Sequence, residues 1–151
     1  MLERRVVLAN CLVALAFVCV GCGKTSPPAI VPVQGVVLLA GVPLPRAQVR
    51  FIPNIGLGAE YIAVGVTDAE GRFKLECNGK SGACAAEHLV LVGEPDIPAQ
   101  YQGENRQREL AVYLQTLKNR PIPANYSSPV STPLHVTVTD PQPELKLELA
   151  R

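Results

Sequence analysis

The segment "TDAEGRF", residues 67–73, carries the residue types of a calcium loop, because an acidic pair that includes Asp68 precedes Gly71. If Gly71 is the sixth position of an EF-hand loop, the first and twelfth positions fall on Val66 and Cys77, which supply no carboxylate. The flanking segments also have the pattern of strands rather than helices. We therefore expect a turn in which Asp68 accepts backbone hydrogen bonds and Gly71 adopts a positive φ.

Cys77, Cys84 and His88 are a second set of candidate metal ligands. A structural zinc site needs four ligands, and no fourth lies at a suitable spacing. The two cysteines flank the turn-forming segment "NGKSGA", and the chain begins like an exported protein. The sequence predicts a disulfide between Cys77 and Cys84, which would contribute about 2–3 kcal/mol. Free thiols and zinc are the alternatives, and no metal or other cofactor is expected.

Catalytic chemistry has few candidates, because His88 and His135 are the two histidines and each falls in a predicted strand. The chain contains no G-x-S-x-G, H-E-x-x-H or glycine-rich phosphate-loop motif. A hydrolytic triad need not be contiguous in sequence, so a small hydrolase stays as the third hypothesis. The prediction is that the protein is not an enzyme and has no catalytic residues.

Three tyrosines are candidates for a binding surface: Tyr101, Tyr113 and Tyr126. An aromatic ring with a hydroxyl offers an apolar face and a polar end to a ligand. Packing within the domain is the alternative role. Two of these tyrosines end the related segments "IPAQY" (97–101) and "IPANY" (122–126).

Short apolar runs separated by turn signals predict about seven strands, at spacings typical of a β-sandwich. The run at 87–93 is almost continuously apolar, so it should be an interior strand. The runs at 61–67 and 72–76 should form a pair joined by the turn discussed above. The remaining strands are expected at 33–39, 47–52, 134–139 and 144–150.

Residues 104–119 interrupt this pattern and predict one amphipathic helix lying on the domain. Pro121 and Pro123 follow and prevent its continuation. Its apolar side chains recur at helical spacing: Leu110, Tyr113, Leu114 and Leu117.

The N-terminus has the features of an export signal, with Arg4 and Arg5 before an apolar run that is short for a membrane span. The run ends in "CVGC", which resembles a bacterial lipobox in which the last residue, Cys22, is lipidated. We expect a signal peptide at 1–21, a tether at 22–31 and one domain at 32–151. An ordinary signal peptide and a transmembrane anchor are the alternatives.

Charge argues against nucleic acid as a partner. The chain has 14 basic and 13 acidic residues, and loss of Glu3, Arg4 and Arg5 with the signal peptide leaves equal numbers of each. No basic run stands out, so binding to a phosphate backbone has no electrostatic support.

Three stretches together resemble the carboxypeptidase regulatory-like domain, as found in small lipoproteins of planctomycete-type bacteria. These are "VQGVVLLAGVPLPRAQVRFIP", "GVTDAEGRFKL" and "IPANYSSPVSTPLHVTV", and the resemblance covers most of 33–149. It implies a transthyretin-like or Ig-like, seven-stranded Greek-key β-sandwich and no activity. The predicted helix and the cysteine pair depart from the family pattern.

These observations predict a lipid-anchored module of the cell envelope with a structural or binding role. It would be held to the inner or outer membrane by its N-terminal lipid and face the periplasm or the exterior. The alternative is a glycan- or peptide-binding module that uses the loop end or the inserted helix. An envelope protein or an envelope polysaccharide would be the partner.

Overall fold

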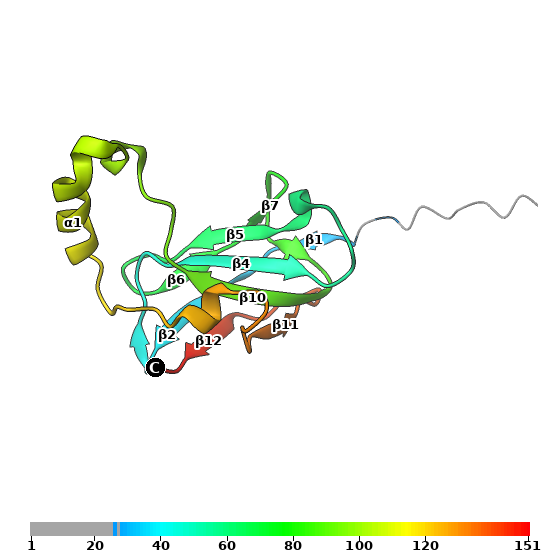
Figure 1. The fold of residues 1–151 in the computed structure, drawn as a ribbon. Helices are drawn as coiled ribbons and strands as arrows, with labels where there is room; N and C mark the ends of the chain where they lie inside the picture. Colours follow the sequence, from blue (N-terminus) through cyan, green and yellow to red (C-terminus); the bar gives the residue numbers. More distant parts are fainter. Residues whose placement is uncertain (1–25, 27) are drawn as a thin grey trace, which may run out of the picture.

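The computed structural model describes residue 26 and residues 28–151 of the chain. Within that part the chain forms twelve strands in three sheets, together with one α-helix (Figure 1). The prediction of an all-β fold with one inserted helix is confirmed. The predicted signal peptide, and Cys22 with it, lie outside the described residues.

The larger sheet has six strands in the order β11-β10-β4-β5-β7-β8. Strand β10 lies between β4 and β11, and so it is the interior strand that its continuous apolar run predicts. The strands of this sheet are β4 (Gln48–Pro53), β5 (Ala63–Val66), β7 (Glu76–Cys77), β8 (Lys80–Ser81), β10 (Glu87–Gly93) and β11 (His135–Thr137).

The second sheet is built around β2, which pairs with three other strands. The final strand, β12, runs parallel to β2, whereas β3 and β6 run antiparallel to it. A third, two-stranded sheet joins β1 to β9 near the described N-terminus. The strands of these two sheets are β1 (Ile30–Val31), β2 (Gln34–Leu39), β3 (Val42–Pro43), β6 (Arg72–Lys74), β9 (Ala83–Cys84) and β12 (Leu145–Leu149).

The core lies between the two larger sheets and follows from alternation along their strands. In β4, Val49 and Phe51 are fully buried, while the intervening Arg50 is exposed. Phe51 packs against Phe73 of the second sheet with a ring-centroid distance of 6.4 Å. Truncating such a buried Phe to Ala costs about 3–5 kcal/mol, so these contacts hold the sheets together. Other core side chains come from both sheets: Val37, Leu39, Val90, Val92, Leu147 and Leu149.

The predicted pair of strands at 61–67 and 72–76 is only partly correct. The segment 72–76 divides at Leu75, because β6 pairs with β2 in one sheet and β7 pairs with β5 in the other. Leu75 itself is buried, and its N–H donates to the carbonyl of Val33 at 3.0 Å. The segment therefore crosses from one sheet to the other instead of completing a hairpin.

The turn that precedes β6 has the geometry that its sequence predicts. The Asp68 carboxylate accepts hydrogen bonds from the N–H groups of Glu70 at 3.0 Å and Arg72 at 2.8 Å. Gly71 has φ of 75°, and a Cβ at this position would lie 2.7 Å from the carbonyl oxygen of Val37. Asp68 and Gly71 therefore act as turn residues.

Residues 94–121, which we call the arm, leave the larger sheet after β10 and return before the last strands. The arm contains two 3₁₀ turns, η2 (Ala99–Tyr101) and η3 (Glu104–Arg106), and the helix α1 (Gln107–Gln115). Two further 3₁₀ turns, η1 (Ala59–Tyr61) and η4 (Ala124–Ser127), lie outside it. None of the helices in the described residues is both long and apolar enough to span a membrane.

The predicted helix at 104–119 is shorter in the structure and differently placed. Its first residues form η3, and α1 ends where the hydroxyl of Thr116 donates to the carbonyl of Tyr113 at 2.6 Å. Instead of lying on the sandwich, α1 projects beyond one end of it, and β1 lies toward the other end (Figure 1). Its main neighbours are therefore η2 and η3 of the same arm.

Candidate functional site

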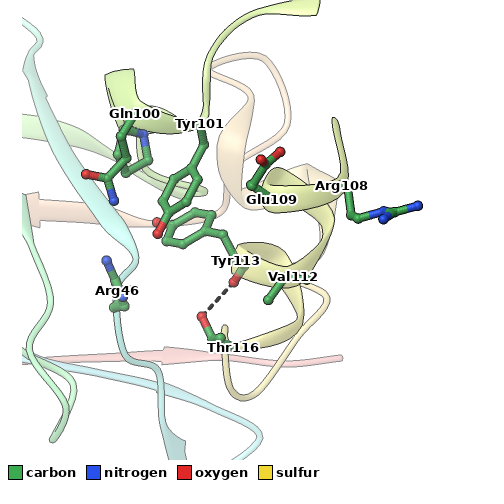
Figure 2. A pocket seen from close by; sticks show the side chains of 9 residues that line it. Arg46, Gln100, Tyr101, Arg108, Glu109, Val112, Tyr113 and Thr116 are labelled. Carbon is green, nitrogen blue, oxygen red and sulfur yellow. Dashed lines mark hydrogen bonds between the residues drawn. The ribbon is translucent and has the colours of Figure 1, made fainter. Parts of the chain in front are cut away.

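Two tyrosines of the arm and one arginine of the sandwich meet in a pocket at the base of the arm (Figure 2). The rings of Tyr101 and Tyr113 are stacked, with centroids 4.7 Å apart and an interplanar angle of 22°. The Cζ atom of Arg46 lies 5.1 Å from the centroid of the Tyr113 ring. Tyr113 is therefore only 7% exposed, although it belongs to a projecting helix.

The pocket has a volume of about 480 Å³, which is within the range of pockets for small ligands. Its walls combine apolar and polar groups, so it can hold an apolar face and also form hydrogen bonds. Besides the two tyrosines and Arg46, the lining residues are Pro98, Gln100, Arg108, Glu109, Val112 and Thr116.

The backbone at Arg46 is fixed from several sides. Arg46 has φ of 54°, and its N–H donates to the carbonyl of Thr67 at 3.0 Å. The buried hydroxyl of Thr67 accepts from the N–H of Ala47 at 2.8 Å and donates to the carbonyl of Leu44 at 2.6 Å. Thr67 therefore closes the turn before β4 and directs the Arg46 side chain toward the arm.

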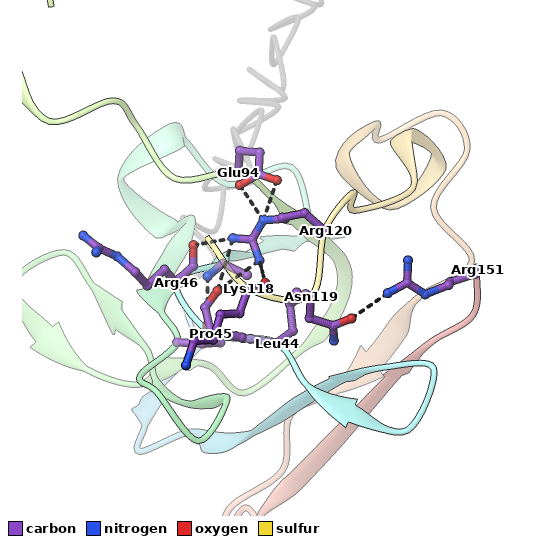
Figure 3. A network of polar contacts seen from close by, with 10 residues as sticks. Leu44, Pro45, Arg46, Glu94, Lys118, Asn119, Arg120 and Arg151 are labelled. Atoms are coloured by element: carbon purple, nitrogen blue, oxygen red, sulfur yellow. Dashed lines mark hydrogen bonds and ion pairs between the residues drawn. The ribbon is translucent and has the colours of Figure 1, made fainter. Parts of the chain in front are cut away.

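Arg120 fastens the end of the arm to the same turn (Figure 3). Its Nε lies 2.7 Å from a carboxylate oxygen of Glu94, the first residue of the arm. Its other nitrogens donate to the carbonyls of Pro45 at 3.1 and 3.2 Å, Arg46 at 3.1 Å and Lys118 at 2.8 Å. The Arg120 side chain is 14% exposed and that of Glu94 is 48% exposed, so a partly exposed ion pair joins both ends of the arm.

Asn119 makes a second attachment beside Arg120 (Figure 3). Its side-chain NH₂ lies within 3.1–3.3 Å of three carbonyl oxygens, those of Leu39, Val42 and Pro43. Its side-chain oxygen accepts from Nη2 of Arg151 at 2.7 Å. Asn119 has φ of 56°, a conformation that Asn tolerates better than most residues. The return of the arm is thus bonded to the β2–β3 connection and to the C-terminus.

Tyr126, the third predicted binding residue, is not part of this pocket. It is buried, and its hydroxyl accepts from the N–H of Ala150 at 2.9 Å. The related segments 97–101 and 122–126 both form 3₁₀ turns, closed by N–H groups of Tyr101 and Tyr126. The same local motif therefore places one tyrosine in the pocket and the other beneath the C-terminal strand.

Cys77 and Cys84 are both buried, and both are free thiols. The predicted disulfide is therefore not present in the structure, where the two side chains pack in the core as small apolar groups. Burial raises the pKa of the Cys77 thiol to about 11, and burial also raises the pKa of Cys84. Within the described residues, no three His, Cys, Asp or Glu side chains are grouped closely enough to hold a metal ion.

The two histidines do not combine into a catalytic site. His88 is fully buried against Phe51, and burial lowers its pKa below the usual 6.5. Its Nδ1 lies 2.9 Å from the carbonyl oxygen of Ala86, and its Nε2 has no partner among the described residues. His135 is exposed on β11, one position out of register with His88, so the two side chains point to opposite faces of the sheet.

Arg46, Glu94 and Arg120 were missed by the sequence analysis. Arg120 directly follows the predicted helix at 104–119, and Glu94 precedes that helix by ten residues, so their opposite charges were an available signal. Arg46 follows a Pro in a turn, and its sequence neighbourhood gives no sign of a distant tyrosine. No protein-family model, curated protein or solved structure matches the chain.

Proposed function

We propose that the protein is a lipid-anchored module of the bacterial cell envelope that binds a ligand in the pocket at the base of the arm. The main observation in support of this proposal is that Arg46 contacts Tyr113, which is stacked on Tyr101. These groups come from separate parts of the chain and line an open pocket of ligand size.

The proposed anchor rests on the N-terminal sequence. A basic start, an apolar run and "CVGC" favour cleavage before Cys22 and lipidation of that residue. The sandwich would then be a member of the carboxypeptidase regulatory-like group, with the Greek-key order of transthyretin-like domains. Three segments, at 33–53, 65–75 and 122–138, support this membership.

A purely structural module is the second candidate, because Tyr113 also has a packing role. In that case the stacked rings would do no more than stiffen the arm. A hydrolase has less support, because His88 is enclosed in the core and His135 faces away from it. The two candidates differ in one expected result. A binding module retains a ligand through the exposed residues of the pocket, whereas a purely structural module retains none.

Retention of the full chain on washed envelope material tests the binding proposal. The protein is purified in detergent and incubated with envelope that has been stripped of it, and the retained fraction is measured. Tyr101→Leu should reduce retention, because Tyr101 is half-buried and lines the pocket. Tyr61→Leu is the matched control, since Tyr61 is also half-buried but lies in η1, outside the pocket. Equal retention of both variants and the unaltered protein would refute a binding role for the pocket.

The anchor is tested separately by labelling cells with a palmitate analogue. The proposal requires that the unaltered chain takes up the label and that Cys22→Ala does not. Label retained by Cys22→Ala would place the lipid elsewhere. An unlabelled native protein would refute the anchor while leaving the binding experiment unaffected.

A further inference from the structure

We infer that the pocket at the base of the arm takes a carboxylate-bearing saccharide, held by the guanidinium of Arg46 and the ring of Tyr101. This inference rests on the proposed binding function and names the class of ligand for that site.

The Arg46 guanidinium is available to an anion. In the described part of the chain it makes no ion pair or side-chain hydrogen bond, and it lies over the Tyr113 ring. A guanidinium presents two parallel N–H donors that match the two oxygens of a carboxylate. Because the Arg46 backbone is fixed by Thr67 and Arg120, less motion is lost when an anion binds.

Charge around the pocket also favours an anion. Its lining includes Arg46, Arg108 and one carboxylate, that of Glu109, and the Arg108 guanidinium points away from Arg46 (Figure 2). The expected mature chain has equal numbers of acidic and basic residues, so this local positive excess is not a general property of the protein. An anionic ligand is therefore attracted to this place more than to the surface as a whole.

The remaining walls suit a sugar ring. Tyr101, Val112 and Pro98 give apolar surface for the C–H face of a sugar. Gln100 can donate and accept hydrogen bonds, and Glu109 can accept them, which matches neighbouring hydroxyl groups. A ligand with one carboxylate, several hydroxyls and an apolar ring face satisfies all of these groups together.

An extended peptide fits the pocket less well. Peptides that add to a β-domain commonly pair with a free strand edge. The lining residues of this pocket come from η2, α1 and the turn before β4, and none belongs to a strand. A peptide would therefore find no row of backbone donors and acceptors, whereas a saccharide needs none.

The position of the pocket favours a source of the ligand other than the headgroups of the anchoring membrane. The entering chain is tied beside the start of β10, because the N–H of Ala85 donates to the carbonyl of Ala29. The arm begins directly after the end of β10, at Glu94. The six steps from residue to residue along β10, at about 3.4 Å each, separate these places by roughly 20 Å. The arm and the entering chain thus lie at opposite ends of the sandwich (Figure 1).

Calorimetric titration of the full chain in detergent tests the inference with a tetramer of galacturonic acid. The methyl-esterified tetramer is the matched probe, because it keeps the rings and masks the carboxylates. The acid should bind about tenfold or more tightly than the ester. Arg46→Gln should weaken binding of the acid by a similar factor, and Arg46→Lys should weaken it less. Arg50→Gln removes the same charge from an exposed position of β4 and should bind normally.

Each other result overturns the inference. Equal binding of acid and ester, or unchanged affinity in Arg46→Gln, would show that no carboxylate is held by Arg46. Tighter binding of a short peptide with a free C-terminal carboxylate would assign the pocket to peptides. If neither tetramer binds, the saccharide is wrong, and retention of the Tyr101 variant on envelope material then shows separately whether the pocket binds at all. Circular dichroism of each variant verifies that the sandwich is folded.

Discussion

Replacing Arg120 by Met should release the arm from the sandwich while the sheets stay folded. Met keeps most of the aliphatic stem and removes every hydrogen-bond donor. The arm would lose its ion pair to Glu94 and its bonds to the carbonyls of Pro45 and Arg46. Core strands such as β4 and β10 lose no direct contact.

The size of the effect follows from the number and burial of these bonds. A net contribution of about 1 kcal/mol is typical for each hydrogen bond to a carbonyl, and Arg120 bonds to two carbonyls of the sandwich, those of Pro45 and Arg46. The ion pair adds about 1 kcal/mol or less, because the Glu94 side chain is 48% exposed. We therefore expect the free energy of opening the arm to fall by about 2–3 kcal/mol.

Native-state hydrogen exchange measures this opening directly. A loss of about 3 kcal/mol corresponds to exchange about 10²-fold faster, up to the rate of an unprotected chain. Amides of α1 should show this acceleration, and amides of β10 should not. Arg50→Met is the control for loss of an exposed arginine, and Arg120→Lys should give an intermediate rate because it keeps the charge without the planar fork.

Two results would refute the reasoning. If α1 exchanges at the same rate in Arg120→Met as in the unaltered protein, the bonds of Arg120 do not hold the arm. If β10 accelerates as much as α1, the arm and the sandwich unfold as one unit. One exchange experiment measures both segments and therefore tests both outcomes.

Three further predictions concern the sandwich itself. Burial lowers the pKa of His88 below 6.5, so the unfolded chain binds a proton at this histidine more readily than the folded chain does. The free energy of unfolding should therefore fall by up to about 1.4 kcal/mol per pH unit as the pH drops below about 6.5. Urea unfolding measures this slope, which should be absent in His88→Phe. Gly82→Ala should lower the free energy of unfolding by about 3 kcal/mol or more, since the new Cβ would overlap the β1 backbone. Gly79→Ala should lower it by about 1 kcal/mol, because Gly79 has φ of 70° but open space around it. Equal melting temperatures of the two variants would contradict this. With a pKa raised from 9.0 to about 11, Cys77 should react with iodoacetamide at least about 100-fold more slowly than an exposed thiol at neutral pH, and rapid labelling of the folded protein would refute its burial.

The strands that sequence predicts well are those in which burial alternates over five or more residues. In β4 every second side chain is buried, and in β12 every second side chain is buried or half-buried, so a period of two is visible in the sequence itself. The strands that it misses, such as β3 and β9, are two residues long and carry no period. The division of 72–76 at Leu75 was also missed, because the choice of sheet depends on distant partners such as β2 and β5.

The candidate site was predictable only in part for a similar reason. The helical period marks Tyr113 as a buried position, and the structure buries it, but its neighbours are Tyr101 and Arg46 rather than the face of a sheet. A period reports that a side chain is covered and does not identify what covers it. Tyr126 has the same local motif as Tyr101, and the position of the C-terminal strand alone gives it a different role.

The ion pair between Glu94 and Arg120 also makes the arm an exchangeable part. The chain departs from the sandwich and returns to it at one place, 2.7 Å apart at these two side chains. Closing a loop across such a point costs only about 0.6 kcal/mol more for each doubling of its length. Arms of other lengths and sequences can therefore replace residues 95–118 with little effect on the sheets, so the sandwich can keep its core while the proposed recognition element changes.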